Sequence, residues 1–206
     1  IMAIISNAVT IADAGAFSAS LGSMTLIKTI TASSAATVSF VHGSSSVVFN
    51  NTYPLYLFKF INCHPVTINK DFTFNMSIDS GSNYNVTKTS TVIETYHSED
   101  DSGSGLGYHG SYDLAQSTAF QSLANAVGNN NDDSFNGELT IFNPSSTTFQ
   151  KHFISRGSHA QGGGTSSSHI VAGYGNITNA VNAVQFKFSS GNIDSGTIKL
   201  YGIKDS

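Results

Sequence analysis

Apolar and polar residues alternate along most of this chain in short runs, and small polar residues separate one run from the next. Alternation with a period of two is typical of β-strands that bury one face. Glycine, asparagine, serine and proline gather between the runs, and these residues favour turns. The pattern predicts strands at 24–31, 37–42, 47–50, 56–61, 72–78, 90–96, 137–142, 151–155, 170–174, 184–188 and 197–203.

Two of these runs indicate how the strands are layered. Residues 55–61 are apolar on both faces, which is typical of a central strand covered on each side. Residues 197–201 keep one polar face. Regularly spaced strands with little helix favour two packed sheets. The sequence therefore predicts an all-β, jelly-roll-like antiparallel β-sandwich with long loops and at most one short helix.

The C-terminal stretch predicts a hairpin. One alternating run ends at Phe188, a Gly/Asn/Asp/Ser cluster follows, and a second run continues to Ile203. Strand, turn and strand in succession are the signal for a β-hairpin. We expect this hairpin to close the sandwich, with the end of the chain held in a sheet.

One segment allows two interpretations. Phe120, Leu123, Ala124 and Val127 have the spacing of a helix face, and Gly128 could end such a helix. Residues 120–123 could equally open another strand. Both alternatives remain open at the level of sequence.

The remaining chain reads as loops within one domain. Residues 98–110, 128–136 and 156–168 predict long loops, which are often functional surfaces. No linker, repeat or change of composition divides the chain, so we expect a single domain over 1–206. The apolar start of the chain would be a liability on a free monomer, and we expect 1–23 to form an arm that packs on a neighbouring subunit or a particle.

Charge and composition exclude several functions. Only 11% of the 206 residues are charged, the net charge is −4 and no basic run occurs, so we expect no nucleic-acid partner. No apolar stretch reaches the roughly 18 residues that span a membrane, and the start lacks the basic region of a signal peptide. The single cysteine, Cys63, excludes an internal disulfide and fits synthesis in a reducing cytoplasm.

Candidate catalytic and metal chemistry is weak. The seven histidines show none of the spacings typical of zinc sites, and neither a nucleophile elbow nor a phosphate-binding loop occurs. Glu94 and Glu138 are predicted on the solvent faces of strands. The acidic groups 99–101 and 132–133 read as solvated turns, with Ca²⁺ as the alternative. We therefore expect no catalytic residue, no cofactor and no resident metal.

One constellation suits carbohydrate binding. Tyr108, His109 and Tyr112 lie in or beside the long polar loop at 98–110. Aromatic rings flanked by amides and hydroxyls are a common means of holding a sugar, whereas ordinary aromatic anchors of a loop are the alternative. We name these three residues as the candidate contact site for a host glycan.

Four blocks in a fixed order resemble a known group of proteins. They are YLFKFIN at 56–62 with His64-Pro65 after it, SIDSGSNY at 77–84, GELTIFNPSS at 137–146 and SGNIDSGTIKLYGI at 190–203. Together they resemble small virion structural proteins of tailed bacteriophages, notably marine ones such as cyanophages and pelagiphages.

The resemblance implies a non-enzymatic virion component, either a tail-fibre or tail-tip element or a capsid decoration. It implies a jelly-roll-like fold, a virion location and other virion proteins as partners. Because such parts repeat on a particle, we expect a homo-oligomer, with a trimer among the expected forms. A carbohydrate-binding or receptor-binding tip is the alternative function, and a polysaccharide-degrading enzyme is a further one.

Overall fold

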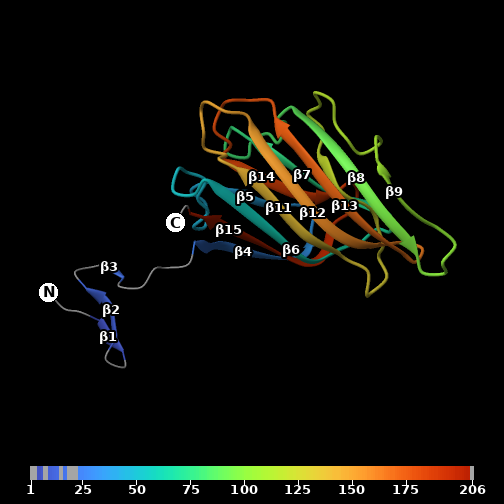
Figure 1. Ribbon diagram of the computed structural model, residues 1–206, viewed down its shortest axis with the longest axis horizontal. Coiled ribbons are helices and arrows are strands. Elements are labelled where there is room, and N and C mark those ends of the chain that lie inside the picture. The colour runs from blue at the N-terminus through green and yellow to red at the C-terminus, as the bar shows by residue number, and fades with distance from the viewer. Residues whose placement is uncertain (1–3, 7–8, 14–15, 18–22, 205–206) are drawn as a thin grey trace.

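A computed structural model describes residues 4–6, 9–13, 16–17 and 23–204 (Figure 1). Its strands are β1 (Ile4–Ser6), β2 (Val9–Asp13), β3 (Ala16–Phe17), β4 (Met24–Ala35), β5 (Val38–Val41), β6 (Leu55–Pro65), β7 (Lys70–Ser77), β8 (Lys88–Ser98), β9 (Ser104–Tyr108), β10 (Gln121–Val127), β11 (Phe135–Phe142), β12 (Lys151–Gln161), β13 (Thr165–Gly175), β14 (Ala183–Phe188) and β15 (Ile193–Ile203). No helix occurs in the described ranges.

Strands β4–β15 form one antiparallel sheet of 12 strands that folds over itself into two layers (Figure 1). The front layer has the order β4-β15-β6-β11-β12-β13-β8-β9, and the back layer has the order β10-β7-β14-β5. A single register pair, Val127 of β10 with Gln161 of β12, joins the two layers. This layered arrangement places a core between two faces that are each built from distant parts of the chain.

The predicted all-β antiparallel class is confirmed. The finer prediction of a jelly roll stays a prediction, because such a fold has eight strands in two Greek keys. Here three successive strands, β11, β12 and β13, lie side by side between β6 and β8 of the front layer. Strands β4 and β15 extend that layer further at its other side.

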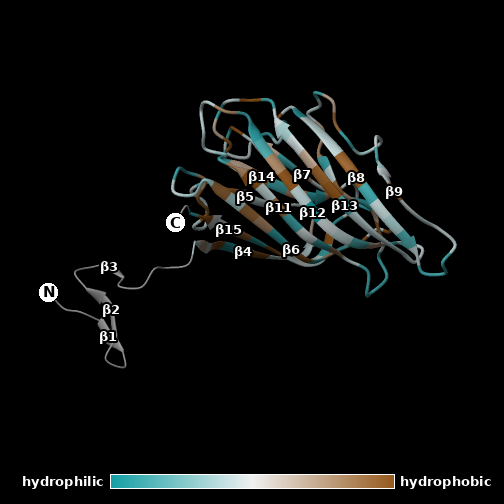
Figure 2. Ribbon diagram, viewed as in Figure 1, coloured by the Kyte–Doolittle hydropathy of each residue, from teal (hydrophilic) through white to brown (hydrophobic). Residues whose placement is uncertain are grey.

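Aromatic rings fill the space between the layers. Phe186 on β14 lies 5.0 Å from Phe58 and 5.1 Å from Phe60 between ring centroids. It also stacks on Phe72 at 6.1 Å. Along the second half of β14, buried phenylalanines alternate with less buried polar residues. Figure 2 shows hydrophobic and hydrophilic segments along the strands of the sheet. Burial of these rings provides the main driving force for folding.

Two predicted elements differ from the structure. Residues 47–50 are no strand, although Val47 and Phe49 are buried in the core. Their backbone is held by a turn and by side chains: Ser44 accepts from the Val47 amide, and His42 Nδ1 accepts from the Phe49 amide at 3.0 Å. The alternation here arises because Val47 and Phe49 insert their side chains into the core, although this segment does not pair with a neighbouring strand.

The predicted C-terminal hairpin is wrong, although both of its strands exist. β14 pairs with β5 and β7 in the back layer, whereas β15 pairs with β4 and β6 in the front layer. The turn residues between them carry the chain from one layer to the other. Local turn chemistry therefore identified a change of direction without identifying the strand partner.

Two predicted loops contain regular structure. Residues 156–168 form the end of a hairpin in which β12 and β13 pair continuously to Gln161 and Thr165. Gly163 and Gly164 close its turn with φ of 142° and 74°. Residues 98–110 contain the edge strand β9, and the ambiguous segment at 120–127 is the strand β10. Residues 128–134 remain a loop.

The described parts of the N-terminal segment form a separate sheet with the order β1-β2-β3. In Figure 1 this small sheet lies apart from the two layers. The predicted arm at 1–23 falls partly outside the described residues. Its packing on a neighbour stays a prediction.

Candidate functional site

The three residues predicted to contact a glycan point in different directions. Tyr108 ends the edge strand β9 with 60% of its surface exposed, and its hydroxyl donates a hydrogen bond to Asp113. His109 turns inward, with Nε2 3.1 Å from Glu94 Oε2. The Tyr112 ring packs on the His109 ring at 4.5 Å between centroids. They do not form one exposed aromatic surface.

Tyr112 lines a hollow of about 370 Å³ near the back layer. Two carboxylates, several hydroxyls, a lysine and an aromatic ring surround it: Asp71, Asp113, Thr73, Ser111, Ser122, Ser189, Lys187 and Phe120. The Lys187 ammonium lies 4.2 Å from the centre of the Phe120 ring. We call this feature the polar hollow, and its mixture of ring faces, carboxylates and hydroxyls suits a small polyhydroxylated ligand.

Tyr112 was identified from the sequence, but the other residues that line the polar hollow were not. Asp71 comes from β7, Lys187 from β14, and Asp113 and Phe120 from the connection between β9 and β10. Only the position of Asp113 directly after Tyr112 could have signalled its participation. The remaining residues are brought together by the strand order of the back layer.

A buried polar cluster lies behind Tyr112, and Glu94 is its centre. Glu94 Oε1 accepts hydrogen bonds from Ser167 Oγ at 2.9 Å, Asn125 Nδ2 at 3.1 Å and Gln161 Nε2 at 3.3 Å. Burial alone would raise the pKa of Glu94, yet the hydrogen bond from Ser167 and the neighbouring His169 hold that pKa below its ordinary value. The result is a fixed, charged carboxylate.

The prediction that Glu94 faces solvent is wrong, since only 11% of its side chain is exposed. Glu94 pairs with His169 across the β8–β13 ladder, and both side chains turn toward the interior. At this end of the sandwich the inner face carries polar residues. Glu94 lies on the same face of β8 as the buried residues Ser90 and Val92, and this face is the inner one.

Two buried histidines complete the cluster. His159 Nε2 donates to Asn125 Oδ1 at 3.0 Å, and its ring lies 5.4 Å from that of His169. Burial, reinforced by the nearby His169, lowers the pKa of His159 to about 4, and burial also lowers the pKa of His169. His159 Nδ1 and both ring nitrogens of His169 lack a hydrogen-bond partner, although His169 Nε2 lies 3.5 Å from Glu94. Because their pKa values are lowered, His159 and His169 are neutral near pH 7.

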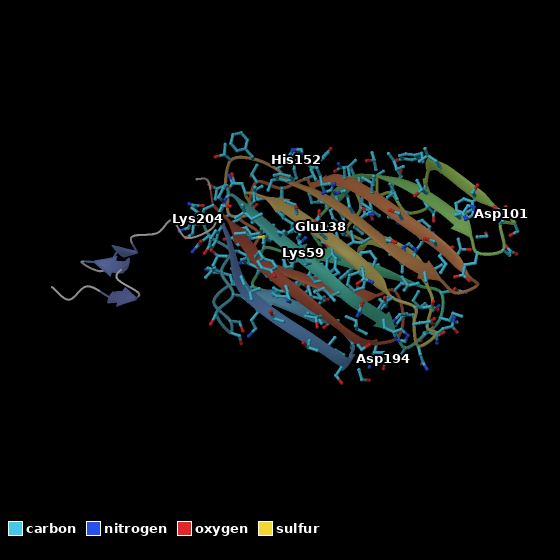
Figure 3. All side chains as sticks on the ribbon, turned by 60° about the horizontal axis from the view of Figure 1, so that its bottom comes forward. Lys59, Asp101, Glu138, His152, Asp194 and Lys204 are labelled. Atoms are coloured by element: carbon cyan, nitrogen blue, oxygen red, sulfur yellow. The ribbon has the colours of Figure 1, made fainter. Side chains whose placement is uncertain are left out.

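The described ranges contain no group of three or more His, Cys, Asp or Glu residues that could hold a metal ion. The first acidic group, residues 99–101, lies at the far end of the β8–β9 hairpin (Figure 3). There Asp101 Oδ1 lies 3.2 Å from His97 Nε2. Asp132 and Asp133 line a separate hollow of about 380 Å³ together with His64 and Asp194. Calcium binding by either group stays an untested alternative.

The outer surface of the front layer exposes several apolar side chains. Ile93 of β8 pairs with Ile170 of β13, and Ile154 of β12 pairs with Ala172, two residues along β13 from Ile170. These three are 42%, 46% and 44% exposed, and we call them the outer isoleucine face. Leu106 and Tyr108 on β9 extend it, with 75% and 60% exposure.

A charged row continues the same surface toward β6. Glu138 accepts from Lys59 at 3.1 Å and from Arg156 at 2.8 Å, and Figure 3 shows Lys59 and Glu138 side by side on adjacent strands. The hydrogen bond from Lys59 is the main reason that the pKa of Glu138 is lowered. This glutamate therefore has a solvent-side position, as predicted, in an ion-pair network.

Comparison with known proteins gives no relative: no family model, no curated protein and no solved structure matches this chain. In the part of the chain that the structure describes, no helix has the length and apolar character needed to cross a membrane.

Proposed function

We propose that this protein is a non-enzymatic structural component of a tailed-phage virion surface, as a tail-fibre or tail-tip element or a capsid decoration. The outer isoleucine face carries the proposal, because exposed isoleucines on neighbouring strands of a sheet favour contact with another protein. The sequence blocks that resemble marine phage virion proteins support the proposal that this contact is made on a phage particle. A homo-oligomer and other virion proteins are the proposed partners.

Lysine substitutions on the outer isoleucine face test the assembly. Ile154→Lys combined with Ile170→Lys should shift the oligomer to a monomer in light scattering coupled to size exclusion, while circular dichroism stays unchanged. Thr52→Lys with Ser102→Lys adds the same charge at exposed positions elsewhere and should leave the oligomer intact. A wild-type protein that is monomeric at all concentrations would refute assembly through this face.

Location needs a separate measurement. Antibodies against the chain should label purified virions of the phage that encodes it in electron micrographs. The position of the label distinguishes the tail from the capsid. An absence of the chain from purified particles would refute the virion role.

The polar hollow favours glycan recognition as a second function. Its two carboxylates can accept hydrogen bonds from sugar hydroxyls, and the rings of Tyr112 and Phe120 can pack on the apolar face of a sugar. A glycan array probed with the oligomer tests this function. Asp71→Asn should weaken binding about tenfold, because an amide replaces a charged acceptor.

The matched control for glycan binding is Asp101→Asn, which makes the same change outside the polar hollow. It should leave binding unchanged. Equal loss in both variants, or no binding by the wild type, would contradict recognition at this hollow. Release of soluble sugar from host polysaccharide would instead indicate an enzyme.

A further inference from the structure

Lys88 and Asn75 meet in the interior between the two layers. Lys88 begins β8 in the front layer and Asn75 belongs to β7 in the back layer, and both are 0% exposed. Lys88 Nζ contacts Asn75 Oδ1 at 2.6 Å and the Val86 carbonyl at 2.8 Å. A lysine amine is thereby enclosed against a side-chain carboxamide.

The carboxamide of Asn75 has a fixed orientation. Its Nδ2 donates to the carbonyls of Tyr84 at 2.7 Å and Thr118 at 3.0 Å. Its Oδ1 accepts the Met76 backbone N–H at 2.8 Å as well as Lys88 Nζ. The Met76 N–H is placed to stabilise negative charge on Oδ1 if a nucleophile adds to Cγ.

No carboxylate among the described residues forms an ion pair with Lys88. Burial without a counter-ion lowers the pKa of this amine to about 7. A large fraction of Lys88 is then neutral at physiological pH, and a neutral amine is the nucleophilic form. Lys151 offers a comparison, because it is equally unexposed but contacts only the backbone carbonyls of Phe149 and Thr178.

We propose that Lys88 and Asn75 condense to an internal isopeptide bond that covalently links the two layers. Nζ shifts from Oδ1 to the adjacent Cγ and forms an N–C bond there. The Cγ–Nδ2 bond breaks, a proton passes from Nζ to Nδ2, and ammonia leaves. The reaction exchanges one amide for another and needs no oxidant or reductant. The Val86 carbonyl stabilises the positive charge that develops on Nζ during attack.

Intact mass spectrometry of the full-length chain tests the proposal. The cross-linked protein should weigh about 17 Da less than its sequence mass, because one molecule of ammonia is lost when the amine acts as a nucleophile. Tryptic mapping should show no cleavage after Lys88 and should yield a branched peptide that joins the segments containing residues 75 and 88. In freshly purified protein, the reaction should accelerate as the pH rises through 7.

Three variants separate the cross-link from other losses of ammonia. Lys88→Met and Asn75→Ala should each have their full sequence mass, whereas Lys151→Met should keep the deficit. If the first two variants fold poorly, the wild-type peptide map still decides the matter. A wild-type protein of full sequence mass that is cleaved after Lys88, after incubation at pH 8, would overturn the proposal.

Discussion

Phe186 is the residue on which the aromatic core converges. Its ring contacts those of Phe58, Phe60 and Phe72, which come from both layers. Removing it leaves a cavity that neighbouring rings on rigid strands fill only in part. The stability of the sandwich therefore depends on this position more than on any exposed phenylalanine.

Phe186→Ala should lower the free energy of unfolding by about 3–5 kcal/mol, the usual cost of truncating a buried phenylalanine. Chemical denaturation monitored by circular dichroism measures this loss. Phe149→Ala removes the same atoms from a side chain that is 67% exposed and should change the stability by less than about 0.5 kcal/mol. Equal losses in the two variants would contradict the assignment of Phe186 to the core.

The buried histidines predict a stability that depends on pH. His159 has a folded pKa of about 4, below its ordinary value of 6.5, so the unfolded chain binds more protons between these values. Its contribution is fully present above pH 6.5 and is lost as the pH falls toward 4. The loss amounts to roughly 3 kcal/mol, from about 1.4 kcal/mol for each pKa unit.

His159→Gln should flatten the fall in unfolding free energy between pH 6.5 and 4, as measured by denaturation at a series of pH values. His97→Gln replaces a ring whose side chain is 61% exposed and should leave the fall unchanged. A variant and a wild type with identical pH profiles would rule out His159 as the source.

Sequence alone identified core residues better than site residues. Alternation correctly marked inward apolar positions such as Phe186 and Ile198, because hydrophobic residues define a face wherever the interior is apolar. The same logic failed at Glu94, which was predicted to face solvent but lies where the interior itself is polar. A polar residue on the inner face of a strand cannot be distinguished from one that faces solvent until the fold is known.

At the scale of elements, the β12–β13 hairpin depends on a residue without a side chain. A Cβ on Gly173 would lie 2.6 Å from the Thr89 carbonyl, 2.7 Å from Phe153 and 2.8 Å from Ser90 Cβ. These contacts come from both neighbouring strands, and one of them is backbone that cannot rotate away. Close approach therefore explains glycine at this position.

Gly173→Ala should destabilise the protein by about 1–3 kcal/mol through overpacking. Thermal and chemical denaturation measure the change. Gly107→Ala is the matched control, since a Cβ there meets no atom within 4 Å on the edge strand β9. A neutral result at Gly173 would show that β8 and β13 can separate more easily than the register implies.

Strands were easier to predict than their partners. Runs such as 184–188 and 197–203 matched β14 and β15 closely, because the period of two is a local property. Pairing depends on the whole chain, and the turn at 189–192 changes layers where a hairpin was expected. The predicted strands 151–155 and 170–174 are parts of β12 and β13, but their continuation toward the turn was assigned to a loop, because its serines, glycines and histidines do not show an apolar–polar alternation.

At the scale of the whole molecule, the sandwich should fold without the N-terminal segment. All 12 strands of the two layers lie between Met24 and Ile203, and β1–β3 form their own sheet. Deletion of residues 1–22 should therefore shift the melting temperature by less than about 2 °C. Differential scanning calorimetry measures the shift, and a large decrease would mean that the segment packs on its own sandwich.

The pairing of the first and last strands of the sandwich has a consequence for synthesis. β15 lies between β4 and β6 in the front layer, so until β15 has been synthesised β4 has no partner strand in this layer and β6 is paired only with β11. The nascent chain must carry unpaired strand edges while it waits, which exposes it to aggregation. Completion of this layer therefore waits for the last strand of the sandwich, and its speed is governed by the closure of the long loop between β4 and β15.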